Sequence, residues 1–406
     1  MKHLIDFKIL FRNRNLGFLF VGQFVSFMGS MITSVALPYQ IYQQTHSTLM
    51  VGLLSLAQLI PLIFTALIGG VFADRYHRRM LLVISEIILA IGCLSFAFNA
   101  SLSSPSITVL FIVASIMSAV VGLHRPALDS IVQQIVHPSE FSAVASLSSF
   151  KFSVGMIVGP AMGGVIIATF GLITTYLVDF MTFFISLFSI LMMSHVPPPE
   201  KTHDDSTFDS LKTGFRYAIS RQELMGSYLV DFVAMVFGMP TALFPAIASH
   251  IGGAKTLGLL YATPAIGAFF VSLFSGAAKN VKRHGAAIAI SAVLWGIAII
   301  FFGLINNFYI ALFFLALAGA ADAVSGIFRS VLWNETIPNH LRGRLAGIEM
   351  ISYLSGPRLG DTEAGLVAAA LGVTASIVSG GVLCVVGVAL SCYFLPKFWK
   401  YKSTVQ

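Results

Sequence analysis

The sequence predicts an all-α polytopic membrane protein, with twelve transmembrane helices in two pseudo-symmetric six-helix bundles. The composition, the length of the apolar segments and the placement of the cations support this prediction. Of the 406 residues, 57% are hydrophobic and 10% are charged, whereas about 25% of a soluble domain is charged. Because so few charged side chains cannot cover a water-exposed surface, the composition excludes a soluble enzyme, a disordered chain and a coiled coil.

Apolar segments of transmembrane length follow one another along the chain. A helix needs about 20 apolar residues to cross the hydrocarbon core, and these segments carry the Gly and Ala typical of packed membrane helices. The alternating strands of about 10 residues expected for a membrane β-barrel are not found in the sequence. The expected helices are 15–42, 49–72, 80–100, 107–135, 141–168, 172–195, 223–249, 257–278, 286–305, 308–336, 344–370 and 373–396.

The twelve segments fall into two similar halves. Gln23-Phe24-Val25 in the first segment corresponds to Asp231-Phe232-Val233 in the seventh. Val51-Gly52-Leu53-Leu54, which opens the second segment, corresponds to Leu257-Gly258-Leu259-Leu260, which opens the eighth. We therefore predict an N-terminal bundle at 1–195, a central cytoplasmic loop at 196–222 and a C-terminal bundle at 223–406. Parallel six-helix repeats are typical of secondary transporters, whose substrate site lies between the halves near the midplane.

The cations mark one face of the membrane. The chain has 24 Lys and Arg residues, and 19 of them fall in the termini and alternate loops on one side, whereas Lys255 alone falls on the other. Cytoplasmic loops are rich in Lys and Arg, so both termini are expected in the cytoplasm. The net charge of +7 is then a topology signal, and we expect no nucleic-acid partner.

The sequence indicates neither a metal site nor a cofactor site. Cys93, Cys384 and Cys392 lie in apolar segments without a C-x-x-C pair, which is typical of buried small side chains. No G-x-x-x-x-G-K-[ST] loop is present, so direct use of ATP is not expected. The long basic-flanked first segment leads into further spans, so we expect a true first helix and no cleavable signal peptide.

The loop after the second segment carries a recognisable motif. Gly70–Arg79 reads GVFADRYHRR, with a glycine, apolar positions, Asp-Arg and two further basic residues. It resembles the signature loop of the major facilitator superfamily, although His77 stands where that family often has glycine. The resemblance implies that the loop helps to gate the cytoplasmic side. The gating candidates are Gly70, Asp74, Arg75, Arg78 and Arg79.

Part of this loop and three other stretches resemble one branch of that superfamily, the drug:proton antiporter branch of enterobactin, macrolide and multidrug exporters. They are Ala73–Tyr76 in the loop, and Leu37–Ile41, Thr45–Thr48 and Gly258–Ala262 elsewhere. The resemblance implies a monomeric, proton-coupled exporter of an amphipathic small molecule in the bacterial inner membrane. A siderophore is the favoured substrate, and a macrolide or other lipophilic drug is the alternative. The Gly155–Gly164 stretch also resembles the antiporter motif of such exporters, although simple close packing explains it equally well.

Ionisable residues inside the spans are the candidates for proton coupling, because an unpaired charge in hydrocarbon is costly. Asp231 lies about eight residues into the seventh segment, or roughly 12 Å along a helix. Asp322 and Glu349 lie on the tenth and eleventh segments. Each acid could bind a proton or the substrate, or it could be a structural acid bonded to a neighbouring helix.

Other polar side chains are candidates for lining the substrate cavity, which the family resemblance assigns to helices 1, 4, 7 and 10. They are Gln23, His124, Arg125, Lys151, Arg329 and Trp333. Asp322, Arg329 and Trp333 share one helical face, so a cation and an indole could meet an anionic or aromatic substrate. The alternative for Arg329 is a salt bridge to another helix.

Several charged residues have competing interpretations. Arg125 could pair with Asp129 one turn away, or with Asp74 in a cytoplasmic gate. Glu86 and Asp179 are expected to be packing partners. The polar stretch from Arg358 to Asp361 follows Gly356-Pro357, so a broken or loosened eleventh helix lining water is expected there.

Other functions fit the sequence poorly. A membrane-embedded enzyme is disfavoured because no HExxH, GxSxG or GxGD motif is present. A non-transporting sensor or scaffold on the same fold remains a remote alternative, against which the charged residues within the spans argue.

Overall fold

The computed structural model describes residues 6–194, 215–274, 281–338 and 341–403, and within these ranges it is built of helices without strands. The helices are α1 (Lys8–Arg12), α2 (Arg14–Thr45), α3 (Thr48–Arg75), α4 (Arg78–Ser101), α5 (Ile107–Ile135), η1 (Pro138–Glu140), α6 (Phe141–Leu191), α8 (Gln222–Phe237), η2 (Thr241–Leu243), α9 (Phe244–Ile251), α10 (Gly253–Leu273), α11 (His284–Leu304), α12 (Phe308–Thr336), α13 (Arg342–Leu371), α14 (Val373–Phe394) and α15 (Pro396–Trp399).

Ten of the described helical stretches are long and apolar enough to cross a membrane. One of them, Pro138–Leu191, contains two crossings because α6 turns at Gly171, where the backbone has φ 78° and ψ 178°. Only glycine adopts this backbone region readily. The helix α13 adds a further crossing of 30 residues, and its charged residues explain why a hydropathy criterion misses it. The described helices therefore confirm the predicted twelve-helix membrane fold.

The chain forms two compact units, which are considered separately. The first unit contains residues 1–46, 57–203 and 252–262, and the second contains residues 47–56, 204–251 and 263–406. Residues 47–56 and 252–262 fall in the opposite unit from the predicted bundle that contains them, and the predicted domain division stays a prediction. Residues 196–214 of the predicted central loop lie outside the described residues, so the loop stays a prediction.

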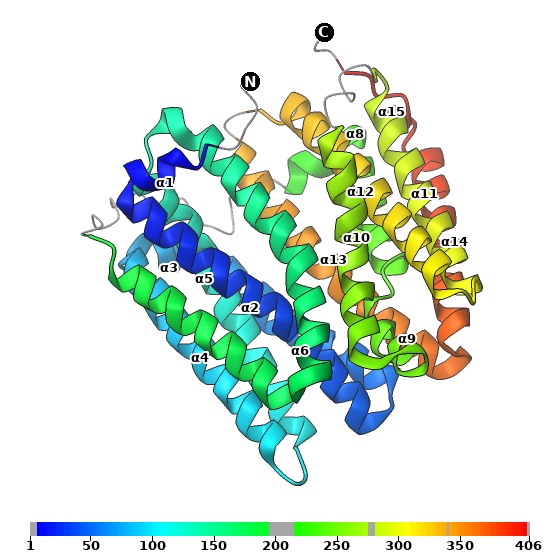
Figure 1. Cartoon of the computed structure of the whole chain (residues 1–406). Coiled ribbons are helices and arrows are strands. Elements are labelled where there is room, and N and C mark those ends of the chain that lie inside the picture. Colours follow the sequence, from blue (N-terminus) through cyan, green and yellow to red (C-terminus); the bar gives the residue numbers. More distant parts are fainter. Residues whose placement is uncertain (1–5, 195–214, 275–280, 339–340, 404–406) are drawn as a thin grey trace. The chain divides into compact units, whose positions relative to one another are not determined.

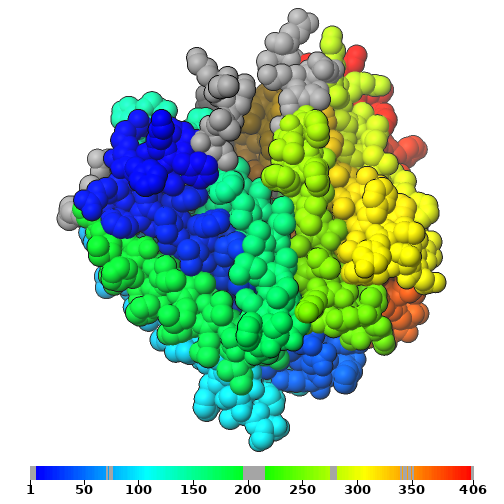
Figure 2. Space-filling model, in the orientation of Figure 1, coloured from blue at the N-terminus to red at the C-terminus, as the bar shows by residue number. Residues whose placement is uncertain are grey.

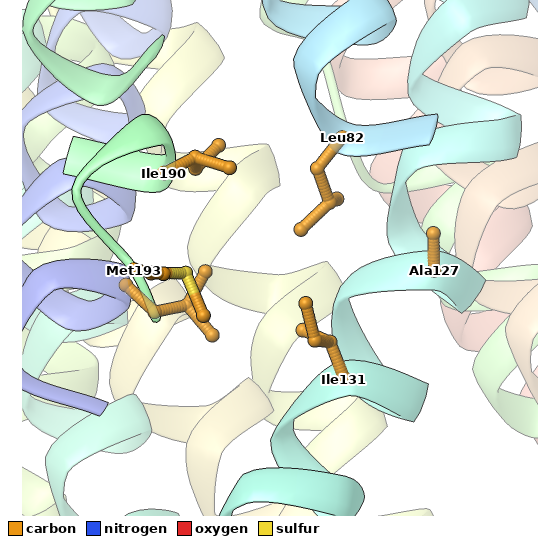
Figure 3. Close-up of a cluster of buried hydrophobic side chains, with 6 residues drawn as sticks. Leu82, Ala127, Ile131, Ile190 and Met193 are labelled. Atoms are coloured by element: carbon orange, nitrogen blue, oxygen red, sulfur yellow. The ribbon is translucent and has the colours of Figure 1, made fainter. Parts of the chain in front are cut away.

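In the first unit, α2 and α4 both pack against α6 (Figure 1). The space-filling view likewise places the atoms of α2 directly against those of α6 (Figure 2). A buried apolar cluster joins four helices: Leu19 from α2, Leu82 from α4, Ala127 and Ile131 from α5, and Ile190 near the end of α6 with Met193 just beyond it (Figure 3). Large apolar side chains such as Phe64 and Phe98 remain exposed, as lipid-facing residues do.

In the second unit, α11 packs against α12 and α14, and α8 packs against α13 and α14. The predicted helix 223–249 is interrupted here, which corrects the expectation of one continuous helix. The helix α8 ends at Phe237, the chain passes through Gly238-Met239-Pro240, and helix resumes in η2 and α9. Proline cannot donate a backbone hydrogen bond, and it clashes with a preceding helical turn.

The expectation of a broken helix near Gly356-Pro357 was wrong. The helix α13 runs without a break from Arg342 to Leu371, with Pro357 inside it. Neighbouring groups tolerate a proline in a membrane helix when they satisfy the backbone groups that it frees. The interruption lies instead in α8–α9, and it is bonded to the polar stretch of α13.

Candidate transport site

A buried ion-pair cluster lies in the second unit. Arg329 on α12 forms a salt bridge with Asp231 on α8, and a second guanidinium nitrogen lies 3.5 Å from a carboxylate oxygen of Asp322. The side chains of Arg329 and Asp231 are only 13% and 11% exposed, whereas that of Asp322 is 38% exposed. The predicted shared face of Asp322 and Arg329 thus brings them together, and the proposed alternative of a salt bridge between helices is also realised.

An aromatic pair lies next to this cluster. The rings of Tyr228 and Trp333 stack with centroids 5.3 Å apart and planes 26° apart. The indole nitrogen of Trp333 donates a hydrogen bond to the hydroxyl of Ser227, at 3.0 Å. The hydroxyl of Tyr228 is buried and has no hydrogen-bond partner among the described residues. Sequence reasoning missed Ser227 and Tyr228; their position one turn before Asp231 was the available signal.

Glu349 on α13 interacts electrostatically with the ion-pair cluster. The side chain of Glu349 is partly buried, and its charge acts on Arg329 and on Tyr228. One cation, Arg329, therefore faces three acids from three helices: Asp231, Asp322 and Glu349. Such an excess of carboxylates inside a membrane protein is costly unless at least one of them binds a proton.

Two other cavity candidates lie together in the first unit. Gln23, 6% exposed, donates a hydrogen bond to Glu86 at 2.7 Å, and His124 lies 3.4 Å from the same carboxylate oxygen. Gln23 of α2 thus contacts both α4, through Glu86, and α6, through Ser186. The expected packing role of Glu86 agrees with these contacts, while cavity roles for Gln23 and His124 stay predictions.

The remaining cavity candidates, Arg125 and Lys151, belong to one polar group, in which Arg125 is exposed and Lys151 is half-buried. Arg125 lies 3.5 Å from Asp129, one turn along α5, and both side chains are more than half exposed. Lys151 on α6 interacts electrostatically with Arg125 and Asp129. The pair within α5 is the simpler of the two interpretations considered for Arg125.

The gating motif is described only in part. Gly70, Asp74 and Arg75 belong to α3, but the side chains of Asp74 and Arg75 are not described, so a gate between Asp74 and Arg125 stays a prediction. Arg79 donates hydrogen bonds to the carbonyl oxygens of Ile190 and Leu191, at 3.1 and 2.7 Å. A cation bound to the last carbonyls of a helix stabilises its C-terminus. These two hydrogen bonds therefore connect Arg79 of the motif to the C-terminal end of α6.

Asp361 holds the interrupted helix. One carboxylate oxygen accepts the backbone N–H of Ala242, at 2.8 Å, and the hydroxyl of Thr241. The other oxygen accepts the hydroxyl of Ser55, at 2.8 Å. These bonds supply partners that the start of η2 lacks within its own helix. The polar stretch of α13 thus has a structural role that its sequence did not indicate.

Residues 10–404 match the model of a family described as transmembrane secretion effector, a branch of the major facilitator superfamily. The chain belongs to this family. Among curated members, enterobactin exporter EntS of Citrobacter koseri is 28% identical over 374 residues, covering 91% of this chain and 89% of the relative. The EntS of Shigella boydii serotype 18 is 28% identical over 379 residues, with the same coverage.

Solved structures show the same fold for this chain. A POT family transporter in complex with 5-aminolevulinic acid has a TM-score of 0.77 at 13% identity, covering 95% of this chain and 97% of that one. A bacterial homologue of the human lysosomal transporter Spinster has a TM-score of 0.75 at 15% identity, covering 96% and 98%. The predicted superfamily and its resemblance to the exporter branch are therefore confirmed.

Proposed function

We propose that this protein is a proton-coupled exporter of an amphipathic small molecule, with a siderophore of the enterobactin type as the first candidate substrate. It acts by alternating access of the two six-helix halves. The relatives named as enterobactin exporters support this substrate class. The cluster of Arg329 with Asp231 and Asp322 is the observation that carries the coupling.

The unequal exposure of the two acids assigns them different tasks. Asp231 is buried with Arg329, and removing a partner from such a pair leaves an uncompensated charge. Asp322 is more exposed and more distant from Arg329, so it can exchange a proton with water. One cation with two ionised acids carries a net negative charge, and protonation of Asp322 makes these three residues neutral. Asp322 is therefore the proposed proton carrier.

Competition at Asp322 couples the proton to the substrate. A hydroxyl or ammonium group of a substrate binds an ionised carboxylate, which only accepts, more strongly than a protonated one, which also donates through its O–H group. Substrate binding and protonation of Asp322 then oppose each other, as exchange transport requires. The stacked rings of Tyr228 and Trp333 offer an adjacent aromatic surface for the apolar part of the substrate.

Transport by the purified protein in proteoliposomes tests this proposal. An imposed pH gradient should drive uptake of enterobactin, and added enterobactin should release protons. Asp322→Asn should abolish both effects and make substrate binding independent of pH, because the neutral amide accepts a hydrogen bond but cannot exchange a proton. Asp129→Asn is the matched control, because that acid is exposed on α5 and pairs with Arg125. Substrate-dependent proton movement that survives in Asp322→Asn would overturn the assignment.

A macrolide or multidrug antiporter is the second candidate. The acids facing Arg329 outnumber it, and a carboxylate site suits a cationic drug. Cells with and without the gene should be compared for accumulation of enterobactin and of a cationic macrolide. Efflux of the macrolide alone would favour this alternative.

We also propose a monomer in the bacterial inner membrane, with both termini in the cytoplasm. The distribution of Lys and Arg in the sequence supports this orientation. A reporter that fluoresces only in the cytoplasm, fused after Gln406, should be bright. A dark fusion with full expression would contradict the orientation.

A further inference from the structure

The first unit contains a buried carboxylate that the proposed coupling site does not use. Glu86 is 1% exposed and lies eight residues into α4, about 12 Å along the helix. No described Lys or Arg forms an ion pair with it. An ionised acid without a cationic partner at this depth costs several kcal/mol, so its protonation state needs an explanation.

The hydrogen bonds of Glu86 are unequally shared between its two oxygens. Oε1 accepts from the side-chain amide of Gln23 at 2.7 Å and from the hydroxyl of Ser186 at 2.9 Å. Nε2 of His124 lies 3.4 Å from the same Oε1, close enough for an ion pair. Oε2 is buried and has no hydrogen-bond partner among the described residues. The arrangement holds one carboxylate oxygen in place and leaves the other available to a proton.

Two apolar layers enclose this polar group. One layer is the cluster in Figure 3, whose residues lie one helical turn from members of the group: Leu19 from Gln23, Leu82 from Glu86, Ala127 from His124 and Ile190 from Ser186. The other layer lies one turn away in the opposite direction and contains Leu89, Val120 and Phe183. Apolar side chains thus lie on two sides of the group, while the side chain of His124 is 14% exposed and its Nε2 atom is buried.

The duplication of the chain relates this group to the transport site. Gln23 corresponds to Asp231 in the repeated Gln-Phe-Val and Asp-Phe-Val segments. In the second unit, Asp231 bonds to an ionisable residue of α12, Arg329. In the first unit the corresponding residue is an amide, and the acid comes from α4 while the ionisable partner comes from α5. Each unit therefore has a buried carboxylate beside one basic side chain.

We propose that Glu86 and His124 form a second proton-binding site, in which His124 passes a proton between the edge of the first unit and Glu86. Histidine changes charge near neutral pH, and two interacting groups titrate as a pair. A proton can lie on Glu86 or on His124 without changing the net charge of the pair. Its role in transport rests on the proposed proton coupling, whereas proton binding itself does not.

Other ionisable groups near the pair are already occupied. On α6, Asp179 accepts bonds from Thr33, Cys93 and Thr182. On α4, Cys93 therefore faces Asp179, and Arg79 bonds to the end of α6. On α5, Arg125 lies 3.5 Å from Asp129, and Lys151 of α6 lies near both. From α2, the group that contacts Glu86 is the amide of Gln23, which does not titrate.

Infrared difference spectroscopy on the full-length protein in proteoliposomes, without substrate, tests the site directly. A protonated carboxylic acid has its own carbonyl stretching band, so spectra are compared between about pH 5 and pH 8, where histidine titrates. Glu86→Gln should remove one component of this band, because glutamine preserves the shape and accepts the same donors. His124→Gln should retain the component but change its pH dependence, because it removes the ionisable side chain that lies 3.4 Å from Glu86.

Asp129→Asn is the control, because that exposed acid contacts neither Glu86 nor His124 in the structure. A spectrum unchanged by Glu86→Gln overturns the proposal, as does a midpoint unmoved by His124→Gln. If Glu86→Gln fails to fold, the His124→Gln measurement alone decides the outcome. Failure of the proposed function has a different signature: Asp322→Asn would retain proton flux while the Glu86 band still titrates.

Discussion

Arg329 on α12 forms a buried salt bridge with Asp231 on α8, across 98 positions of sequence. The second acid, Asp322, lies 3.5 Å from the same guanidinium. This relationship makes Arg329 the residue that joins two helices of the second unit, and it determines how variants of the cluster should behave.

Replacing one member of the buried pair should lower the free energy of unfolding more than replacing both. Asp231→Asn leaves the charge of Arg329 without its main partner, so we expect a loss of about 3 kcal/mol in the free energy of unfolding. Arg329→Gln should cost a similar amount, because it leaves the acids without their cation. The double variant should lose less free energy of unfolding than the two single variants lose together, and the difference, the coupling energy, should be about 1–3 kcal/mol. Thermal unfolding in detergent measures all four proteins, and strict additivity would contradict the pairing.

Asp361 should stabilise the interrupted helix. Its carboxylate accepts bonds from Ala242 and Ser55, both at 2.8 Å, and from Thr241. Asp361→Ala should lower the free energy of unfolding by about 2–3 kcal/mol, because it removes a helix cap and leaves buried donors unpaired. Asp361→Asn, which retains an accepting oxygen, should cost less. Glu363→Gln, at the neighbouring acid of α13, is the control, and an equal loss in all three variants would exclude the capping role.

The close packing of Asp179 and Thr182 against α2 should require a glycine at position 29. A Cβ at Gly29 would collide with the hydroxyl of Thr182 and a carboxylate oxygen of Asp179. Gly29→Ala should therefore lower the free energy of unfolding by about 1–3 kcal/mol. Gly326→Ala is the matched control in α12, because its nearest neighbour would be the Arg329 guanidinium at 3.6 Å. Stabilisation of both variants, as helix propensity alone predicts, would contradict this packing.

The C-terminal tail should be held by the bond between Tyr401 and Glu335. The phenol of Tyr401 donates to a carboxylate oxygen of Glu335, at 2.8 Å. Tyr401→Phe should cost about 1 kcal/mol in the free energy of unfolding. Burial, with the nearby Glu335 carboxylate, raises the pKa of Tyr401, so this contribution is complete at neutral pH and is lost only in strong alkali, as the phenol ionises. Urea unfolding of wild type and variant at neutral pH measures the difference, and equal stability would show that the tail is not held there.

The number of spans and the family were accessible from sequence because both depend on local chemistry. A segment such as 286–305 is apolar throughout, and water exclusion alone assigns it to the membrane. The turn at Gly171 was likewise bracketed by the predicted ends 168 and 172, since a short non-helical connection must separate two spans. The shared face of Asp322, Arg329 and Trp333 followed from helical periodicity.

The sequence predicted a continuous helix at 223–249 and a broken helix near Pro357, and both predictions were wrong. The helix is interrupted near Pro240, and α13 is continuous. Both helices contain a glycine and a proline: Gly238 and Pro240 in one, Gly356 and Pro357 in the other. Local sequence therefore could not distinguish them. The outcome depends on neighbouring groups, because Asp361 of α13 supplies the hydrogen bonds that the broken segment requires.

Composition and the spacing of cations by themselves determined that this chain is a twelve-helix membrane protein, because the bilayer acts on each segment according to its own length and polarity. Tertiary structure alone decided which charges meet. Glu86 bonds to Gln23 63 positions away, and Asp361 bonds to Ala242 119 positions away. Such partners are brought together by helix packing, so the sequence could name the ionisable residues inside the spans but could not pair them.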